Sequence, residues 1–221
     1  MKNETMTKNN PPQILAHHNT VLNPYLRWLL AARSKDKNRP VLNKVYADYS
    51  ADGTVYLVCT DGRRMHVLEL YETYFNESFS WDGSESFLLD VTQNKVSNVI
   101  FQTCSEDLTF PNWKNVFEQH MTFDKHSNKN EITCKGEHGV STVLIKKALT
   151  HREHPAREDW SLSEKFVADA IGKGTLYRPS NSRESYSWIM HSKTPLEPLV
   201  LEDPEGDRIK PYAVIMPMRA C

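Results

Sequence analysis

The side chains best suited to metal chemistry lie in the second half of the sequence. Three residues separate Cys134 from His138, and two separate His151 from His154. Structural zinc sites take thiolate and imidazole ligands from pairs spaced C-x2-4-C or H-x3-5-H. Neither pair here has such a spacing, so the sequence predicts no metal site and no other cofactor.

Patterns that would indicate enzyme chemistry are also missing from the sequence. The segment Ile171–Gly174 (IGKG) shares only glycine and lysine with a phosphate-binding loop and lacks its G-x4-G-K-[ST] frame. A helix C-terminus explains this segment better. The sequence contains neither G-x-S-x-G nor H-E-x-x-H. We therefore expect no catalytic residue and a protein that is not an enzyme.

Length and composition set the scale of the fold. The 221 residues suffice for one large domain or two modules of about 100 residues. Apolar residues make up 39%, charged residues 25%, and the net charge is −1, which is typical of a water-soluble globular protein. Because there is no overall basic excess, any contact with nucleic acid must come from a local patch.

The cysteines and the first residues bear on location. No C-x-x-C pair occurs, and the polar start has no apolar segment typical of a signal peptide. No apolar run approaches the roughly 20 residues that span a bilayer. We expect a cytoplasmic protein with reduced thiols and a disordered tail over residues 1–12. The four scattered cysteines are Cys59, Cys104, Cys134 and Cys221.

Two helices are expected to pack on sheets. Asn23 followed by Pro24 is typical of a helix start, because asparagine caps and proline needs no hydrogen bond at the first position. Ser161 and Glu164 have the capping-box spacing and predict a second helix start. Apolar residues on one face of each helix should be buried: Leu26, Leu29, Leu30, Phe166, Val167 and Ile171.

Segments rich in valine, tyrosine and leucine predict strands, with Asp52-Gly53 and Asp61-Gly62 as turns between the first three. Residues 86–103 fit two strands or a short helix. We expect an α+β fold of antiparallel sheets with helices on one face, divided into modules at 13–118 and 119–221. The predicted strands are 41–50, 54–61, 64–71, 131–136, 141–149, 175–179, 186–192, 195–203 and 212–218.

The chain ends on an apolar run, Tyr212–Met218 (YAVIMPM), where a frayed and polar terminus would be usual. Pro217 cannot donate a ladder hydrogen bond, which disfavours an interior strand. The run is therefore either a buried edge strand or part of a surface that a partner covers.

Five segments resemble, in the same order, motifs of the bacterial DNA polymerase III β subunit, the sliding clamp. Together they touch most of the chain from about Val21 onward, although this chain has room for two modules where clamps of that family have three domains. A shortened, for instance phage-encoded, clamp would explain the difference. The segments are RPVLN (39–43), TDGRRM (60–65), FPNW (110–113), LSEKFVADAI (162–171) and YAVIMPMR (212–219).

The resemblance implies a groove for short peptides of polymerases and other partners, between the TDGRRM loop and the terminal strand. Flexible, polarizable methionine suits a groove that accepts varied side chains. Residues such as Met65 and Val214 could instead simply fill the core. The resemblance places in the groove Leu42, Thr60, Gly62, Arg63, Arg64, Met65, Val214, Ile215, Met216, Pro217, Met218 and Arg219.

The resemblance also implies a ring around double-stranded DNA. Head-to-tail contacts close rings, and two modules per chain would make a homotrimer the natural ring of six modules. Its inner wall would contact phosphates independently of sequence, with a polymerase, other clamp-motif proteins and a clamp loader as partners. The residues expected to face DNA are Arg27, Lys35, Lys37, Arg39, Lys165 and Lys173.

Three functional hypotheses follow. The first is a non-enzymatic sliding-clamp-like processivity factor that tethers a polymerase to DNA through the peptide groove. The second is a clamp-fold module that forms no ring and binds or competes for clamp-binding peptides. The third, which the cysteine and histidine spacing favours least, is a zinc-dependent DNA-processing enzyme.

Overall fold

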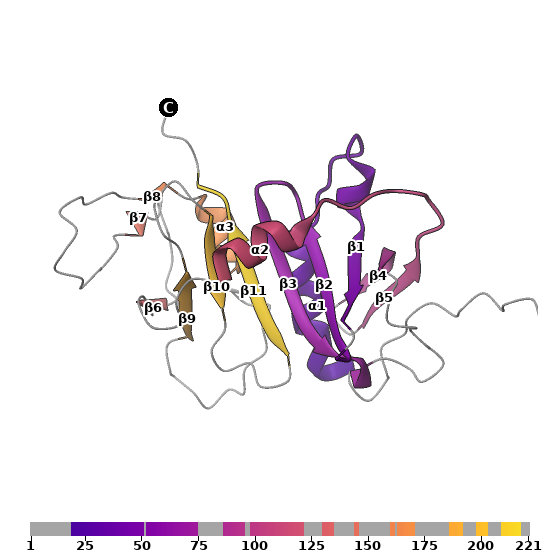
Figure 1. The fold of residues 1–221 in the computed structure, drawn as a ribbon, viewed down its shortest axis with the longest axis horizontal. Helices are drawn as coiled ribbons and strands as arrows, with labels where there is room; N and C mark the ends of the chain where they lie inside the picture. The colour runs from indigo at the N-terminus through magenta and orange to yellow at the C-terminus, as the bar shows by residue number, and fades with distance from the viewer. Residues whose placement is uncertain are drawn as a thin grey trace, which may run out of the picture.

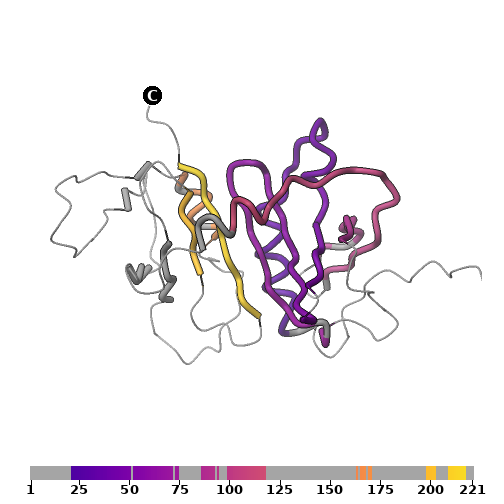
Figure 2. The backbone as a smooth tube through the Cα atoms, in the orientation of Figure 1, coloured from indigo at the N-terminus to yellow at the C-terminus, as the bar shows by residue number. Residues whose placement is uncertain are grey.

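The computed structural model describes eleven stretches of the chain. They are residues 19–50, 52–74, 86–95, 98–121, 130–134, 144–145, 160–161, 163–170, 186–191, 198–202 and 209–217. Figure 1 shows a broad sheet whose strands come from both halves of the chain, and Figure 2 traces the same backbone.

Within these stretches, nine strands form one antiparallel sheet in the order β5-β4-β1-β2-β3-β11-β10-β9-β6, and β7 and β8 form a separate pair. The first half supplies β1 (Val45–Tyr49), β2 (Thr54–Thr60), β3 (Arg64–Tyr71), β4 (Phe87–Lys95) and β5 (Asn98–Thr103). The second half supplies β6 (Asn130–Cys134), β7 (Leu144–Ile145), β8 (Trp160–Ser161), β9 (Tyr186–His191), β10 (Leu199–Glu202) and β11 (Lys210–Ile215).

The two halves join where β3 pairs antiparallel with β11, at the centre of the sheet (Figure 1). Met65 lies opposite Val214, and Val67 opposite Tyr212. The seam is closed by polar contacts as well, since Lys210 Nζ donates to Glu69 over a sequence separation of 141 residues. The terminal strand is therefore an interior strand of the sheet, flanked by β3 and β10.

Helices cover the two faces of the sheet differently. Helices α1 (Asn19–Ala31) and α3 (Glu164–Ala170) pack on one face, and α2 (Trp113–Met121) lies over the other (Figure 1). Neighbouring strand residues alternate between the faces. In β3, His66 and Leu68 lie on the α1 and α3 face, whereas Met65 and Val67 pack in the cluster beneath α2.

Trp28 of α1 links the two halves of the chain on the face of the sheet that carries α1 and α3. Its side chain is fully buried, and its Nε1 donates to the carbonyl of Ala170 at the end of α3, at 2.7 Å. The indole stacks on His66, with 4.2 Å between ring centroids. One aromatic side chain thus contacts β3 and bonds to α3, which holds the helices against the seam.

The α+β class and the antiparallel sheet are confirmed. The strands predicted over 41–50, 54–61 and 64–71 correspond to β1, β2 and β3, and residues 86–103 contain two strands rather than a helix. The predicted strand 175–179 lies outside the described residues. The division at residue 118 stays a prediction, and α2 runs across that position.

Both predicted helix starts are wrong. Helix α1 begins at Asn19 and contains Pro24, while the side-chain oxygen of Asn23 accepts the N–H of Val99 in β5. The Asn23 side chain therefore accepts a backbone hydrogen bond from a strand instead of capping a helix. Ser161 lies in β8, and α3 begins at Glu164, with the Val167 N–H bonding to the carbonyl of Ser163.

The predicted buried helix faces are confirmed where the structure describes them. Leu26 and Leu29 are fully buried, and Leu30 and Val167 are almost so. Phe166 is only partly buried against the core, and Ile171 lies outside the described residues.

His66 should make stability depend on pH. Its Nδ1 lies 2.8 Å from the Trp28 carbonyl oxygen. Because a carbonyl can only accept, Nδ1 donates, and Nε2 of the neutral imidazole carries no proton. Nε2 has no hydrogen-bond partner among the described residues. Burial lowers the pKa of His66 to about 3, against the raising effect of that hydrogen bond. Between that value and roughly 6.5, the usual value in an unfolded chain, only the unfolded chain binds the proton.

The free energy of unfolding should therefore fall as the pH drops through this window, by up to about 1.4 kcal/mol per pH unit from this residue. Urea unfolding at pH 7, 6 and 5 measures the slope. The variant His66→Gln should show a shallower slope than the wild type, and equal slopes in the two proteins would contradict this account of the buried imidazole.

Candidate functional site

The turn between β2 and β3 is held by its own side chains. Asp61 Oδ1 accepts the backbone N–H groups of Arg63 and Arg64, at 2.9 and 3.1 Å. Thr60 Oγ1 accepts the N–H of Gly62 at 3.0 Å and donates to the carbonyl of Arg64 at 2.6 Å. Gly62 has φ +86°, a left-handed conformation that favours glycine. The sequence TDGR therefore specifies a fixed turn rather than a loose loop.

The terminal strand runs directly beside this turn. The β3–β11 ladder extends to Arg64 opposite Ile215, and the Met216 N–H then donates to the Arg63 carbonyl at 2.9 Å. The two segments predicted to form a groove, 60–65 and 214–217, are thus adjacent in space. Met218 and Arg219 lie outside the described residues.

The predicted groove residues differ in exposure. Met65 and Val214 are buried in the cluster that includes Trp113 of α2. Met216 directly follows Ile215, the last residue of β11, and is 41% exposed. It lies two residues after Val214, so by strand alternation it falls on the same face of the sheet. Pro217 is half-buried. Buried apolar side chains and an exposed methionine therefore lie beside the turn, where β3 begins and β11 ends.

The remaining predicted groove residues lie in different surroundings. Gly62 and Arg63 are exposed at the tip of the turn, and Thr60 is buried beneath it. Leu42 is buried in the 3-10 helix Pro40–Asn43, and its carbonyl accepts the Ser34 N–H. Ile215 is fully buried in the core on the helix face.

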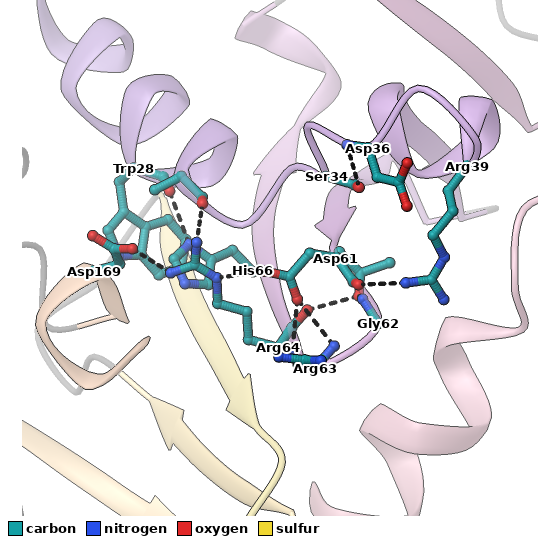
Figure 3. Close-up of polar contacts among 12 residues, drawn as sticks. Trp28, Ser34, Asp36, Arg39, Asp61, Gly62, Arg63, Arg64, His66 and Asp169 are labelled. Atoms are coloured by element: carbon teal, nitrogen blue, oxygen red, sulfur yellow. Dashed lines mark hydrogen bonds and ion pairs between the residues drawn. The ribbon is translucent and has the colours of Figure 1, made fainter. Parts of the chain in front are cut away.

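Arg64 points to the face that carries α1 and α3, where Figure 3 shows it beside Asp169. Met65 packs on the opposite face, in the cluster beneath α2. The Arg64 guanidinium donates to Asp61 at 3.2 Å, to Asp169 of α3 and to the Ala31 carbonyl at the end of α1. It also lies 4.6 Å from the ring centroid of Phe166. Arg64 is 5% exposed, connects the turn to both helices and directs its charge away from the predicted groove.

A cavity of about 640 Å³ opens on this side, between the end of α1, the segment 33–39, the turn and α3. Predicted DNA-facing residues from distant parts of the sequence meet here: Arg27, Lys35, Arg39 and Lys165. Lys37 is exposed but does not line the cavity, and Lys173 lies outside the described residues.

Cations outnumber carboxylates around the cavity. Seven arginine and lysine side chains line it, including Arg33, Arg63 and Arg64, against three carboxylates. Two of these, Asp61 and Asp169, pair with Arg64. Within the described part of the chain, no carboxylate lies within ion-pair distance of Arg27, Arg33, Lys35, Arg63 or Lys165. The cavity is therefore electropositive.

Sequence reasoning missed two residues of this site. Arg33 belongs to the charged run that ends at Arg39, and this run was the available signal. Asp169 is in register with the aspartate of the clamp-like helix motif, yet only the folded chain shows that it receives Arg64. Arg27 Nε is buried and has no partner among the described residues.

The described residues contain no group of three or more histidine, cysteine, aspartate or glutamate side chains that could hold a metal ion. His138, His151 and His154 lie outside them, as does the side chain of Cys134. No helix in the described stretches is long and apolar enough to cross a membrane.

Comparisons with known proteins identify the fold. No protein-family model matches the sequence, and no curated protein matches it. Solved structures of bacterial sliding clamps match consistently. The β clamp of Helicobacter pylori in complex with carprofen is 11% identical, with TM-score 0.59 over 100% of this chain and 69% of that chain. The β subunit of DNA polymerase III from Borrelia burgdorferi is 15% identical, with TM-score 0.53 over 99% and 67%.

The chain of this protein therefore has the α+β fold of a sliding clamp. More narrowly, its structural neighbours include β chains of DNA polymerase III. A third example, from Streptococcus pneumoniae, is 15% identical, with TM-score 0.53 over 99% of this chain and 67% of that chain.

Proposed function

We propose that this protein is a non-enzymatic, sliding-clamp-like processivity factor that tethers a DNA polymerase or another clamp-motif protein to DNA. The observation that carries the proposal is the pairing of β3 with β11, which sets Met216 beside Arg63. The described residues of the clamp-like TDGRRM and YAVIMPMR segments therefore lie side by side. The fold of the chain is that of a sliding clamp.

The partner would be a short linear peptide with a glutamine and aliphatic or aromatic anchors. Met216 and Pro217 supply apolar surface beside the exposed turn, and Met65 and Val214 support it from the core. A flexible thioether can adapt to different anchors. Leu42, Thr60, Gly62 and Arg63 are proposed as further groove residues, and Arg64 positions the turn from the other face. Met218 and Arg219 are proposed for the groove from the resemblance to clamps alone.

DNA would bind on the face that carries α1 and α3, away from the Met65 and Val214 side of the sheet. The apolar anchors of the partner would therefore lie on the face of the sheet opposite to DNA. Contacts of lysine and arginine with phosphates are independent of sequence and weaken with salt. The residues proposed for this role are Arg27, Lys35, Lys37, Arg39, Lys165 and Lys173.

The proposed assembly is a head-to-tail homotrimer of two-module chains, with modules at 13–118 and 119–221, loaded onto DNA by a clamp loader. The alternative is a clamp-fold module that forms no ring and binds or competes for clamp-binding peptides. Light scattering separates these two functions, because a trimer has three times the chain mass of 25.5 kDa.

The trimer should stay on a closed DNA circle at low salt and should leave it when the circle is cut, since a ring slides off a free end. Gel filtration of the labelled protein with intact and linearised circles measures this. A stable monomer that ignores both forms of DNA would contradict the ring and favour the peptide-binding module.

A further inference from the structure

The electropositive cavity beside the turn has a surplus of charge that the fold itself does not need. Of its three carboxylates, Asp61 and Asp169 are engaged by Arg64. Arg33, Lys35 and Lys165 line the cavity without an ion-pair partner among the described residues. Arg33 and Lys35 lie in the segment that follows α1, and Lys165 lies in α3. Gathering like charges around one volume costs free energy unless an anion enters.

Arg63 adjoins both the cavity and the proposed groove. Arg63 lines the cavity, and its backbone carbonyl accepts the N–H of Met216, the exposed apolar residue of the groove. Gly62 and Arg63 are exposed at the same tip. A peptide chain lying on Met216 and Pro217 therefore needs only to pass the tip of the turn to reach the cavity.

We infer that this cavity receives acidic side chains that flank the apolar anchors of the partner peptide. The inference rests on the proposed peptide-binding function and adds to it a charge requirement on the partner. Because Lys35 and Lys165 line this cavity and are also proposed to face DNA, an acidic flank and DNA would compete for these two charges. Apolar anchors would dock at Met216 and Pro217, and carboxylates on one side of them would meet the guanidinium and ammonium groups of Arg33, Arg63 and Lys165.

The size and lining of the cavity favour carboxylate side chains over duplex phosphates. A volume of about 640 Å³ is in the range of small-ligand sites and holds a few side chains, not a double helix. Leu30 and Phe166 also line it, so the methylene groups of glutamate would find apolar contacts. Arginine binds a carboxylate through two parallel hydrogen bonds, and both Arg33 and Arg63 can offer that geometry.

Three labelled peptides with the same glutamine and apolar anchors test the inference. One has neutral flanks, one carries two glutamates before the anchors, and one carries them after the anchors. At low salt, one acidic peptide should bind the wild type about tenfold more tightly than the neutral peptide, as expected of complementary charge. That advantage should shrink in 0.5 M salt, where charges are strongly screened.

Charge-reversal variants locate the effect. Arg33→Glu and Lys165→Glu should remove the advantage of the acidic flank and leave the affinity for the neutral peptide unchanged. Lys37→Glu is the matched control, because Lys37 is exposed in the same segment but does not line the cavity. It should keep most of the advantage. Circular dichroism confirms that each variant is folded.

The outcomes separate this inference from the proposed function. Neutral and acidic peptides that bind with equal affinity would overturn the inference and leave the groove intact. Binding of a single-stranded oligonucleotide that is lost in Lys165→Glu, with no preference for acidic peptides, would assign the cavity to nucleic acid and also overturn it. If no peptide binds at all, the proposed function fails and the inference with it.

Discussion

Replacing Arg64 by alanine is expected to lower the free energy of unfolding by about 3 kcal/mol, near the lower end of the range for breaking a buried ion pair. The guanidinium is buried between the turn and two helices, and its loss leaves Asp61 Oδ2, Asp169 and the Ala31 carbonyl without this donor. Asp61 Oδ1 keeps its two backbone donors. Asp169 is 32% exposed, so water compensates part of the loss. Urea unfolding monitored by tryptophan fluorescence measures the change.

The neighbouring Arg63→Ala is the matched control. Arg63 is exposed, and its structural contacts come from its backbone, so this variant should stay within about 0.5 kcal/mol of the wild type. Arg64→Lys should fall between, because a single ammonium group cannot reproduce the planar fork. If Arg64→Ala and Arg63→Ala proved equally stable, Arg64 would not be the link between the turn and the helices.

Replacing Met216 by glutamate should weaken binding of a neutral-flank, clamp-motif peptide by about thirtyfold or more, which corresponds to the loss of a hot-spot contact of about 2 kcal/mol. Met216 is 41% exposed and lies just beyond β11. The substitution places a charge on apolar surface that the partner would cover, without opening the core. Fluorescence anisotropy of the labelled peptide measures the affinity.

Ile100→Glu provides the control for this variant. Ile100 is also an exposed apolar residue, at 38%, but it lies in β5 at the far end of the sheet. Both variants should unfold at nearly the wild-type urea concentration, and only Met216→Glu should lose the peptide. Equal affinities in the wild type and both variants would show that Met216 is not part of a binding site.

Local sequence signals predicted the local structure well. The strands β1, β2 and β3 follow from valine- and tyrosine-rich runs separated by Asp-Gly turns, because those signals lie within a few residues of one another. Asn23 and Ser161 misled the prediction of helix starts. Asn23 bonds to Val99 in β5, a tertiary contact that no local pattern reveals.

The site depends on contacts between distant segments. No periodicity in the sequence shows that β11 pairs with β3, and only the resemblance to clamps brought those segments together. The alternation of side chains along the predicted strand 64–71 already places Arg64 and Met65 on opposite faces of the sheet. The cavity needs α3 beside the end of α1, which the Trp28 bond to Ala170 secures.

The central claim is that a partner groove lies beside the β2–β3 turn and the end of β11. Amide NMR of the labelled protein during titration with the neutral-flank peptide tests it most directly. The shifted resonances should concentrate at residues 60–65 and 214–216, with little change in β5; Pro217 has no amide proton. Absence of shifts at saturating peptide, or shifts confined to other parts of the sheet, would contradict it.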